Sequence, residues 1–381
     1  MSEFVRWFGA SRIHHIISGR TRQRLHVDGY LTILILILCA LGLTVLYSAL
    51  DQDVRAFTTQ LTRIIIGLAL FVVAACIHKD TYYWLAPVIY SGTIALLIAV
   101  WFYGDVSHGS KRWLDFPGLP RFQPSELLKI SLPLILGWYF AIRKFKNNLL
   151  DIFWIGILVG VPILLIFLQP DYGTAMILCA GTIGVLFVVG FKWWWFAVGG
   201  CSALVATPFI WNFVLYPYHR RRILTLFNPE SDPLDSGWNI IQSKTAIGSG
   251  GFSGKGLFNG TQSRLDFIPE GHTDFVLAVS GEELGFIFCT CLLLLYLLIF
   301  VRAMYISKNA ESGFGFTVGS GICIIFICNV VVNVAMVLGL LPIIGLPLPL
   351  ISYGGSSAIT TMVAFGVLLS VCTRKENREL T

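Results

Sequence analysis

Charged residues are scarce in this sequence: Asp, Glu, Lys and Arg make up only 13% of its 381 residues, whereas 56% are hydrophobic. A soluble protein would carry about 25% charged residues. The apolar residues come in long blocks, each near the length that crosses a hydrocarbon core of about 30 Å. This composition excludes a soluble globular protein and predicts an all-α, polytopic integral membrane protein.

Several motifs are also missing. The nine cysteines are scattered, with no Cys-x-x-Cys pair and no Cys/His ligand spacing, so we expect neither disulfides nor zinc. The first 28 residues are too polar and basic for a cleavable signal peptide. The glycine run 248–260 lacks P-loop spacing. The sequence also has no repeat of fixed period, which a solenoid would show. No stretch indicates a second, soluble domain.

Ten apolar blocks are candidates for transmembrane helices. They lie at 29–50, 61–77, 82–103, 124–142, 152–168, 172–191, 193–215, 275–301, 314–338 and 355–373. The chain then divides into a basic N-terminal segment (1–28), a membrane domain (29–373) and a tail (374–381). Residues 216–273 form a loop far longer than a simple connection needs, which is typical of a functional segment.

Lys and Arg in the short loops indicate the orientation. If the N-terminus is cytoplasmic, the inner loops receive more of them than the outer loops, so we expect both termini in the cytoplasm and the loop 216–273 outside. Arg and apolar residues alternate in 1–28, which is typical of an interfacial helix on the cytoplasmic surface. Trp193, Trp194 and Trp195 predict an aromatic belt rather than a base-stacking platform, and we expect no nucleic-acid partner.

The large outer loop contains patterns of ordered structure. In residues 218–227 a basic run leads into apolar side chains, an amphipathic pattern that predicts a short helix. Asp235 and Ser236 could cap a second short helix over 238–247. We therefore expect a structured extracytoplasmic loop.

Asp274 lies at the end of this loop, where an apolar helix begins. Helix capping is one explanation, because the first turn of a helix favours a carboxylate. We favour a general base, because a partly desolvated carboxylate has a raised pKa that suits proton abstraction from a hydroxyl. Glu282 and Glu283 lie about 12–14 Å deeper along the helix, too far to pair with Asp274. We expect them to be structural and bonded to facing helices.

A second constellation lies in the span that begins at Pro124. Lys129 falls on nearly the same helix face as Glu126, and an intramembrane Lys should face an acid or a wet cavity. Asp171 is the other candidate partner. An internal ion pair is one explanation; we favour a hydrophilic cavity that admits an anionic ligand.

Other basic residues suit a phosphate and sugar, or equally a lipid headgroup. They are Lys111 and Arg112 beside Trp113, the run Arg220 to Arg222, and Lys255 in its glycine run. The segment 341–357 holds prolines and glycines at membrane depth. It predicts a re-entrant loop that lines a cavity; a bare proline-rich connection is the alternative.

Six motifs occur together in this sequence. They are GSKRWLDF (109–116), QPSELLK (123–129), QPDYGTA (169–175), NPESDPLDSGWNIIQSKTAIGSGGFSGKG (228–256), PEGHTDF with GEELG (269–285) and PLPLISYGGSS (347–357). Jointly they resemble the SEDS family of RodA, FtsW and SpoVE proteins, over nearly the whole chain after residue 28. The loop 236–267 resembles the elongation branch of that family more than the division branch.

The resemblance implies ten transmembrane helices and a peptidoglycan glycosyltransferase of the cytoplasmic (inner) membrane with its active site on the outer face. Such enzymes polymerise lipid II, a disaccharide-pentapeptide on undecaprenyl pyrophosphate. The resemblance assigns the catalytic aspartate to Asp274. The substrate-binding candidates are Lys111, Arg112, Trp113, Glu126, Lys129, Asp171, Lys255 and His272.

The resemblance also implies partners: a class B penicillin-binding transpeptidase, the rod-complex proteins MreC and MreD, and membrane lipid. It implies no certain cofactor and is compatible with a divalent cation, for which the sequence shows no dedicated ligand cluster. Two other functions fit part of the pattern. A lipid II flippase would also use Glu126, Lys129 and Asp171, and a non-catalytic scaffold would recruit the transpeptidase but leave the buried charges unexplained. The large ordered loop favours the enzyme.

Overall fold

The computed structural model describes residues 28–107, 110–115, 121–143, 148–232, 236–265, 267–268 and 270–372. The expected N-terminal interfacial helix, the tail 374–381 and the proposed cap at Asp235 lie outside the described residues. The domain boundaries predicted from the sequence therefore stay predictions at both ends.

Ten helices of the described chain are long and apolar enough to cross a membrane. They are α3 (Gly29–Ala49), α4 (Val54–Cys76), α5 (Lys79–Tyr103), α6 (Pro124–Ile142), α7 (Leu149–Leu168), α8 (Tyr172–Val189), α9 (Trp193–Phe209) with the π-helix η1 (Ile210–Val214), α13 (Val276–Lys308), α14 (Gly313–Val337) and α15 (Gly355–Cys372). The predicted all-α polytopic class is confirmed, and the spans match the ten apolar blocks.

The second span begins earlier than the sequence indicated. The prediction put its start at residue 61, but α4 begins at Val54 and includes Arg55, which was wrongly placed in a loop. Asp53 explains the difference, because its carboxylate accepts hydrogen bonds from the amides of Arg55 (2.8 Å) and Ala56 (3.2 Å). This N-cap starts the helix through a polar stretch that hydropathy alone would leave out.

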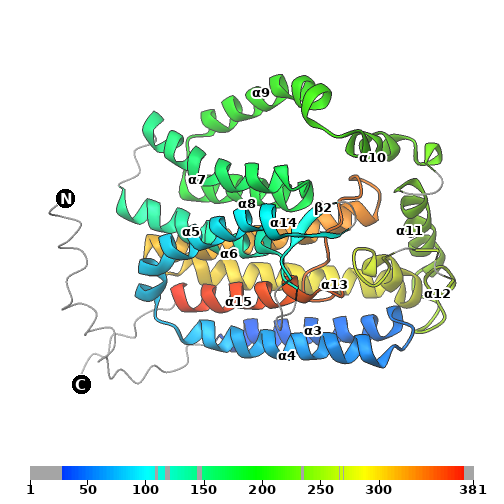
Figure 1. Ribbon diagram of the computed structural model, residues 1–381. Coiled ribbons are helices and arrows are strands. Elements are labelled where there is room, and N and C mark those ends of the chain that lie inside the picture. Colours follow the sequence, from blue (N-terminus) through cyan, green and yellow to red (C-terminus); the bar gives the residue numbers. More distant parts are fainter. Residues whose placement is uncertain are drawn as a thin grey trace, which may run out of the picture.

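The helices lie lengthwise beside one another, with α6, α14 and α15 innermost (Figure 1). About 72% of the apolar window of α6 and of α15 is buried within the protein, whereas none of the α9 window is. In Figure 1, α9 arches away from the other helices. Apart from Phe196, whose ring contacts Phe187 and Phe191, most of its apolar side chains are exposed on the protein and suited to contact lipid.

The described ends of the chain lie at one end of the bundle. Asp28, which caps α3, forms an ion pair with Arg302 near the end of α13, at 2.6 Å. The Ser370 hydroxyl, near the end of α15, donates to the carbonyl of Ile77. The short elements lie at the opposite end (Figure 1). They are β1 (Asp105–Ser107), β2 (Ser110–Trp113), α10 (Pro217–Phe227), η2 (Pro229–Ser231), α11 (Ser236–Gly250) and α12 (Thr261–Arg264).

The two short helices expected in the loop 216–273 are present as α10 and α11, so the prediction of a structured loop is confirmed. The sequence did not predict the β1–β2 hairpin, which lies in the loop between α5 and α6. It is too short to give an alternating pattern that stands out from its surroundings.

The glycine run of the loop closes a break in α13. Gly285 has φ +78°, which interrupts the helix and frees backbone groups on both sides. The amides of Lys255 and Gly256 donate to the carbonyls of Glu282 (3.0 Å) and Glu283 (2.8 Å). Beyond the break, the amide of Phe286 donates to the carbonyl of Gly251 at 2.9 Å. The loop therefore supplies the hydrogen bonds that the kinked helix lacks.

The glycines are needed for this close approach. A Cβ on Gly254 would lie 2.2 Å from the carbonyl oxygen of Glu283, and one on Gly285 would lie 2.3 Å from the amide nitrogen of Gly254. The run is thus a backbone contact surface for α13.

Candidate active site

Asp274 lies just before α13 in a half-buried position. Its carbonyl accepts a hydrogen bond from Nδ2 of Asn333 on α14, at 3.0 Å. The same Nδ2 donates to the carbonyl of Leu346 at 2.6 Å, so one buried amide ties Asp274 to the segment 338–354. Gly345 lies beside the carboxyl group: a Cβ there would be 3.4 Å from Oδ2.

The carboxyl group of Asp274 makes no hydrogen bond and no ion pair with the described residues. The pKa of Asp274 is raised to about 7, mainly by burial and to a lesser extent by the charge of Glu270, while the charge of Arg222 lowers it. A carboxyl group with this pKa exchanges a proton near neutral pH, as a general base must.

The capping explanation for Asp274 is wrong. Phe275 occupies the N-cap position of α13, and no side chain there bonds the first-turn amides. Asp274 is instead held by its backbone, which leaves its carboxylate free for chemistry.

Glu126 and Lys129 form a buried ion pair inside α6, with Nζ 2.8 Å from Oε1. The hydroxyl of Thr360 on α15 donates to Oε2 of Glu126 at 3.3 Å. Of the two acids considered as partners for Lys129, the structure therefore selects Glu126. The internal ion pair is therefore present, but the hydrophilic cavity that we expected to admit an anionic ligand is wrong, because the cavity beside the pair is too small for one.

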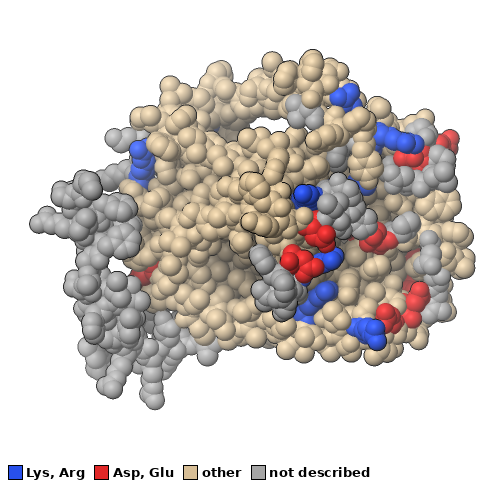
Figure 2. Space-filling view, in the orientation of Figure 1, with Lys and Arg blue, Asp and Glu red and all other residues tan. Residues whose placement is uncertain are grey.

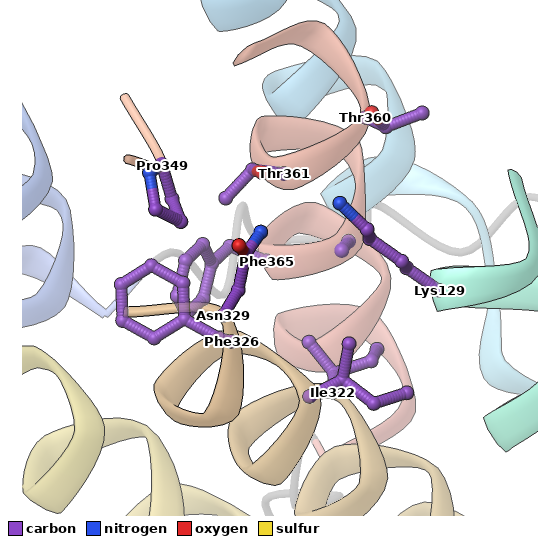
Figure 3. Close-up of a pocket in the computed structure, with 10 residues that line it drawn as sticks. Lys129, Ile322, Phe326, Asn329, Pro349, Thr360, Thr361 and Phe365 are labelled. Atoms are coloured by element: carbon purple, nitrogen blue, oxygen red, sulfur yellow. The ribbon is translucent and has the colours of Figure 1, made fainter. Parts of the chain in front are cut away.

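This cavity has a volume of about 20 Å³ and lies between α6, α14, α15 and Pro349 (Figure 3). Lys129, Asn329 and Thr360 contribute polar atoms to a lining that is otherwise mostly apolar. The cavity can hold a single water molecule but no ligand. The Oδ1 atom of Asn329 is buried without a partner, which such a water would satisfy.

Asp171 joins a separate cluster. It is buried, caps α8, and accepts a hydrogen bond from Nε2 of Gln123 at 2.6 Å. The guanidinium of Arg112 lies 3.8 Å from Asp171 and also donates to the carbonyl of Pro170. Arg112 therefore anchors the β1–β2 hairpin to the start of α8.

The remaining predicted residues lie in three places. Lys111 is exposed and Trp113 is half-buried on β2. His272 lies two residues before Asp274; its ring is 5.8 Å from the ring of Tyr353, whose amide donates to the His272 carbonyl at 2.9 Å. Lys255 is separate from these, in an ion pair with Glu282 at 2.7 Å.

Glu282 is fully buried and serves as an anchor for the loop. Besides Lys255, its carboxylate accepts hydrogen bonds from the amides of Thr261 (2.8 Å), Gln262 (2.9 Å) and Ser263 (3.1 Å). The structural role expected for Glu282 is confirmed, but its partners are Lys255 and the first turn of the short loop helix α12, not the facing transmembrane helices. The backbone amides of residues 261–263 satisfy the Glu282 carboxylate in place of side chains on other helices.

Charged side chains gather over the half of the molecule that carries β2 and α10 to α12, and are sparse over the rest of the face shown in Figure 2. The candidate active site therefore lies at the end of the bundle opposite the described chain ends.

The comparison with known proteins decides the family. The family model FTSW_RODA_SPOVE, described as cell cycle protein, matches residues 29–377. The chain belongs to the FtsW/RodA/SpoVE family. Peptidoglycan glycosyltransferase MrdB of Escherichia coli K12 is 40% identical over 93% of this chain and 95% of its own. A probable peptidoglycan glycosyltransferase FtsW of Trichlorobacter lovleyi is 40% identical over 76% of this chain and 75% of its own.

Solved structures of this family have the same fold. A chain from a peptidoglycan synthase complex, in a study of how polymerization and crosslinking are coordinated, matches with a TM-score of 0.80 and 31% identity, over 91% of this chain and 97% of that one. The crystal structure of the rod shape determining protein RodA of Thermus thermophilus matches with a TM-score of 0.69 and 28% identity, over 91% and 96%.

Within this family member, sequence reasoning missed Asn333, Glu270 and the specific role of Arg222. Arg222 donates to the carbonyl of Ile343 at 2.8 Å and stacks on Tyr218 at 4.5 Å. A polar Asn inside an apolar span was the available signal for Asn333. The triple Arg run drew attention to Arg222 but could not indicate which of its members faces Asp274.

Proposed function

We propose that this family member is a peptidoglycan glycosyltransferase that polymerises lipid II into β-1,4 glycan strands on the outer face of the cytoplasmic membrane during cell elongation. The observation that carries the proposal is the Asp274 carboxyl group, which is unpaired in the described structure and has a pKa near neutrality. The names of the relatives and the coverage of the match to MrdB support it.

In this mechanism Asp274 takes the proton from the 4-hydroxyl of the acceptor's N-acetylglucosamine. That oxygen attacks the anomeric carbon of the donor's N-acetylmuramic acid, and the bond to undecaprenyl pyrophosphate breaks. One displacement inverts α to β, so a single base suffices, as in inverting glycosidases. Positively charged side chains near the site would offset the negative charge that grows on the leaving pyrophosphate.

The acid limb of the pH–rate profile should respond to the two charges near Asp274. Asp274 is a base only when deprotonated, so the rate rises with pH through its pKa. Glu270 raises that pKa and Arg222 lowers it. Glu270→Gln should therefore move the limb to lower pH, and Arg222→Gln should move it to higher pH. We expect this from kcat/KM measured between pH 5 and 9; shifts in the same direction would contradict the assignment.

One assay separates this function from the alternatives. Purified protein is given labelled lipid II, first in detergent and then in sealed vesicles. We expect glycan chains in both. Translocation without chains would indicate a flippase, and neither chains nor translocation would indicate a scaffold. The structure favours the enzyme, because the Asp274 site lies at one end of the helix bundle. A carrier needs a site that is accessible from both ends.

A class B penicillin-binding transpeptidase is the partner that we propose first, since a structurally similar chain comes from a complex that joins polymerization to crosslinking. MreC and MreD stay predictions from the family resemblance. Within the described residues, no three His, Cys, Asp or Glu side chains are placed to hold a metal ion. An assisting divalent cation therefore also stays a prediction, and no step above depends on it.

A further inference from the structure

Arg63 is a cation inside a membrane-spanning helix. It is the tenth residue of α4, about 13 Å along the helix axis from Val54, and apolar residues Ile64 to Ile66 follow it. Charged side chains at such positions are costly, and they usually pair with an acid or mark the path of a substrate or ion. Lys129, also well inside a span, is paired with Glu126.

Arg63 has no such partner. Among the described residues it donates no hydrogen bond and forms no ion pair; its guanidinium lies over the ring of Tyr353, 5.0 Å from the centroid. The side chain is half-buried, so part of it stays open to a ligand. An aromatic face holds a guanidinium in place but does not neutralise its charge.

The chain makes room for this guanidinium at the start of α15. A Cβ on Gly355 would lie 3.3 Å from Cζ of Arg63 and 3.5 Å from Nη2, so the glycine allows the close approach. The first amides of a helix are unpaired and favour an anion. In the same turn, Ser357 is buried and its hydroxyl has no partner. The Arg63 guanidinium thus lies against the first turn of α15, and no ion pair with the described residues neutralises it.

Tyr353 connects this place to the candidate active site. Its ring contacts Arg63 on one side and the ring of His272 on the other, and its amide bonds the His272 carbonyl. His272 is two residues from Asp274. Tyr353 therefore links Arg63, through His272, to the segment that carries Asp274.

We propose that Arg63, with the first turn of α15, binds the pyrophosphate of the prenyl-linked substrate. A guanidinium group binds phosphate through two parallel hydrogen bonds, and a phosphate at this place would neutralise the charge of Arg63. This inference rests on the proposed function for the choice of substrate. The phosphate of an ordinary anionic phospholipid has the same chemistry and is the competing source.

The test measures binding of labelled undecaprenyl pyrophosphate, a product that the enzyme does not consume, to the full chain in nanodiscs. In neutral phosphatidylcholine, Arg63→Gln should raise Kd about tenfold or more, the range for losing a charge-assisted pair of hydrogen bonds. Arg63→Lys should recover part of the loss. Arg55→Gln is the matched control: it removes a positive charge from the exposed outer end of the same helix and should leave Kd unchanged.

An unchanged Kd for Arg63→Gln overturns the proposal. An equal loss of affinity in Arg55→Gln also overturns it. So does a loss of affinity that is seen only when phosphatidylglycerol is present. Either result indicates a general attraction to anionic lipid. If Arg63→Gln does not yield folded protein, Tyr353→Leu removes the supporting ring and should weaken binding about threefold; unchanged binding then overturns the proposal. Polymerisation is scored separately, so a wild-type chain that binds but makes no glycan refutes the function and not this site.

Discussion

Asp274→Asn should lower the rate of glycan polymerisation by about 10²–10⁴-fold, the usual loss for a positioned general base. The substitution keeps the size of the side chain and removes its ability to accept a proton. Because Asn333 holds the backbone carbonyl of residue 274 and not its carboxylate, the fold should be unaffected. Initial rates with labelled lipid II, at equal amounts of monodisperse protein, measure the effect.

Glu270→Gln is the matched control for that experiment. Glu270 lies in the same turn, is exposed, and contributes charge to Asp274 without being placed to take the substrate proton. At a pH high enough to deprotonate Asp274 fully, the Glu270→Gln variant should retain a rate within a few-fold of the wild type. Near-normal polymerisation by Asp274→Asn would refute the assignment of the base.

Glu282→Ala should have the largest effect on stability, lowering the free energy of unfolding by about 3–5 kcal/mol, the range for breaking a buried ion pair. The truncation leaves Lys255 and the amides of Thr261, Gln262 and Ser263 without their acceptor. The segment 255–263 would then lose its side-chain anchor on α13, while the backbone hydrogen bonds at the kink remain. Thermal unfolding of the purified protein in detergent measures the loss.

Glu282→Gln and Glu230→Ala complete that comparison. Glutamine keeps one acceptor oxygen but not the charge, so its unfolding midpoint should lie between those of the wild type and the alanine variant. Glu230 is exposed in the same outer loop and its truncation should change the midpoint little. Equal midpoints for Glu282→Ala and Glu230→Ala would show that Glu282 is no anchor.

The fold could be predicted largely from the sequence, because a bilayer demands apolar blocks of a definite length. The limits of the prediction appear where polar chemistry starts a helix, as Asp53 does for α4. The ion pair of Glu126 with Lys129 could also be predicted, because helical spacing alone brings them together.

Contacts between distant segments could not be predicted. The run 248–260 does not indicate that its backbone replaces the hydrogen bonds lost at Gly285. The ion pair of Lys255 with Glu282 depends on that contact, and it could not be predicted either. Asn333 and Arg63 are single polar residues within apolar spans. Hydropathy averages over such residues, and their meaning depends on what faces them across the bundle.

The pH dependence of kcat/KM for lipid II polymerisation tests the central claim most directly. With Asp274 as the base, activity should rise with pH through a midpoint near 7, where burial places the pKa of this carboxyl group. The small residual rate of Asp274→Asn should lack that limb. A wild-type midpoint near 4, the ordinary range for Asp, or the same limb in the Asn variant, would mean that another group takes the proton.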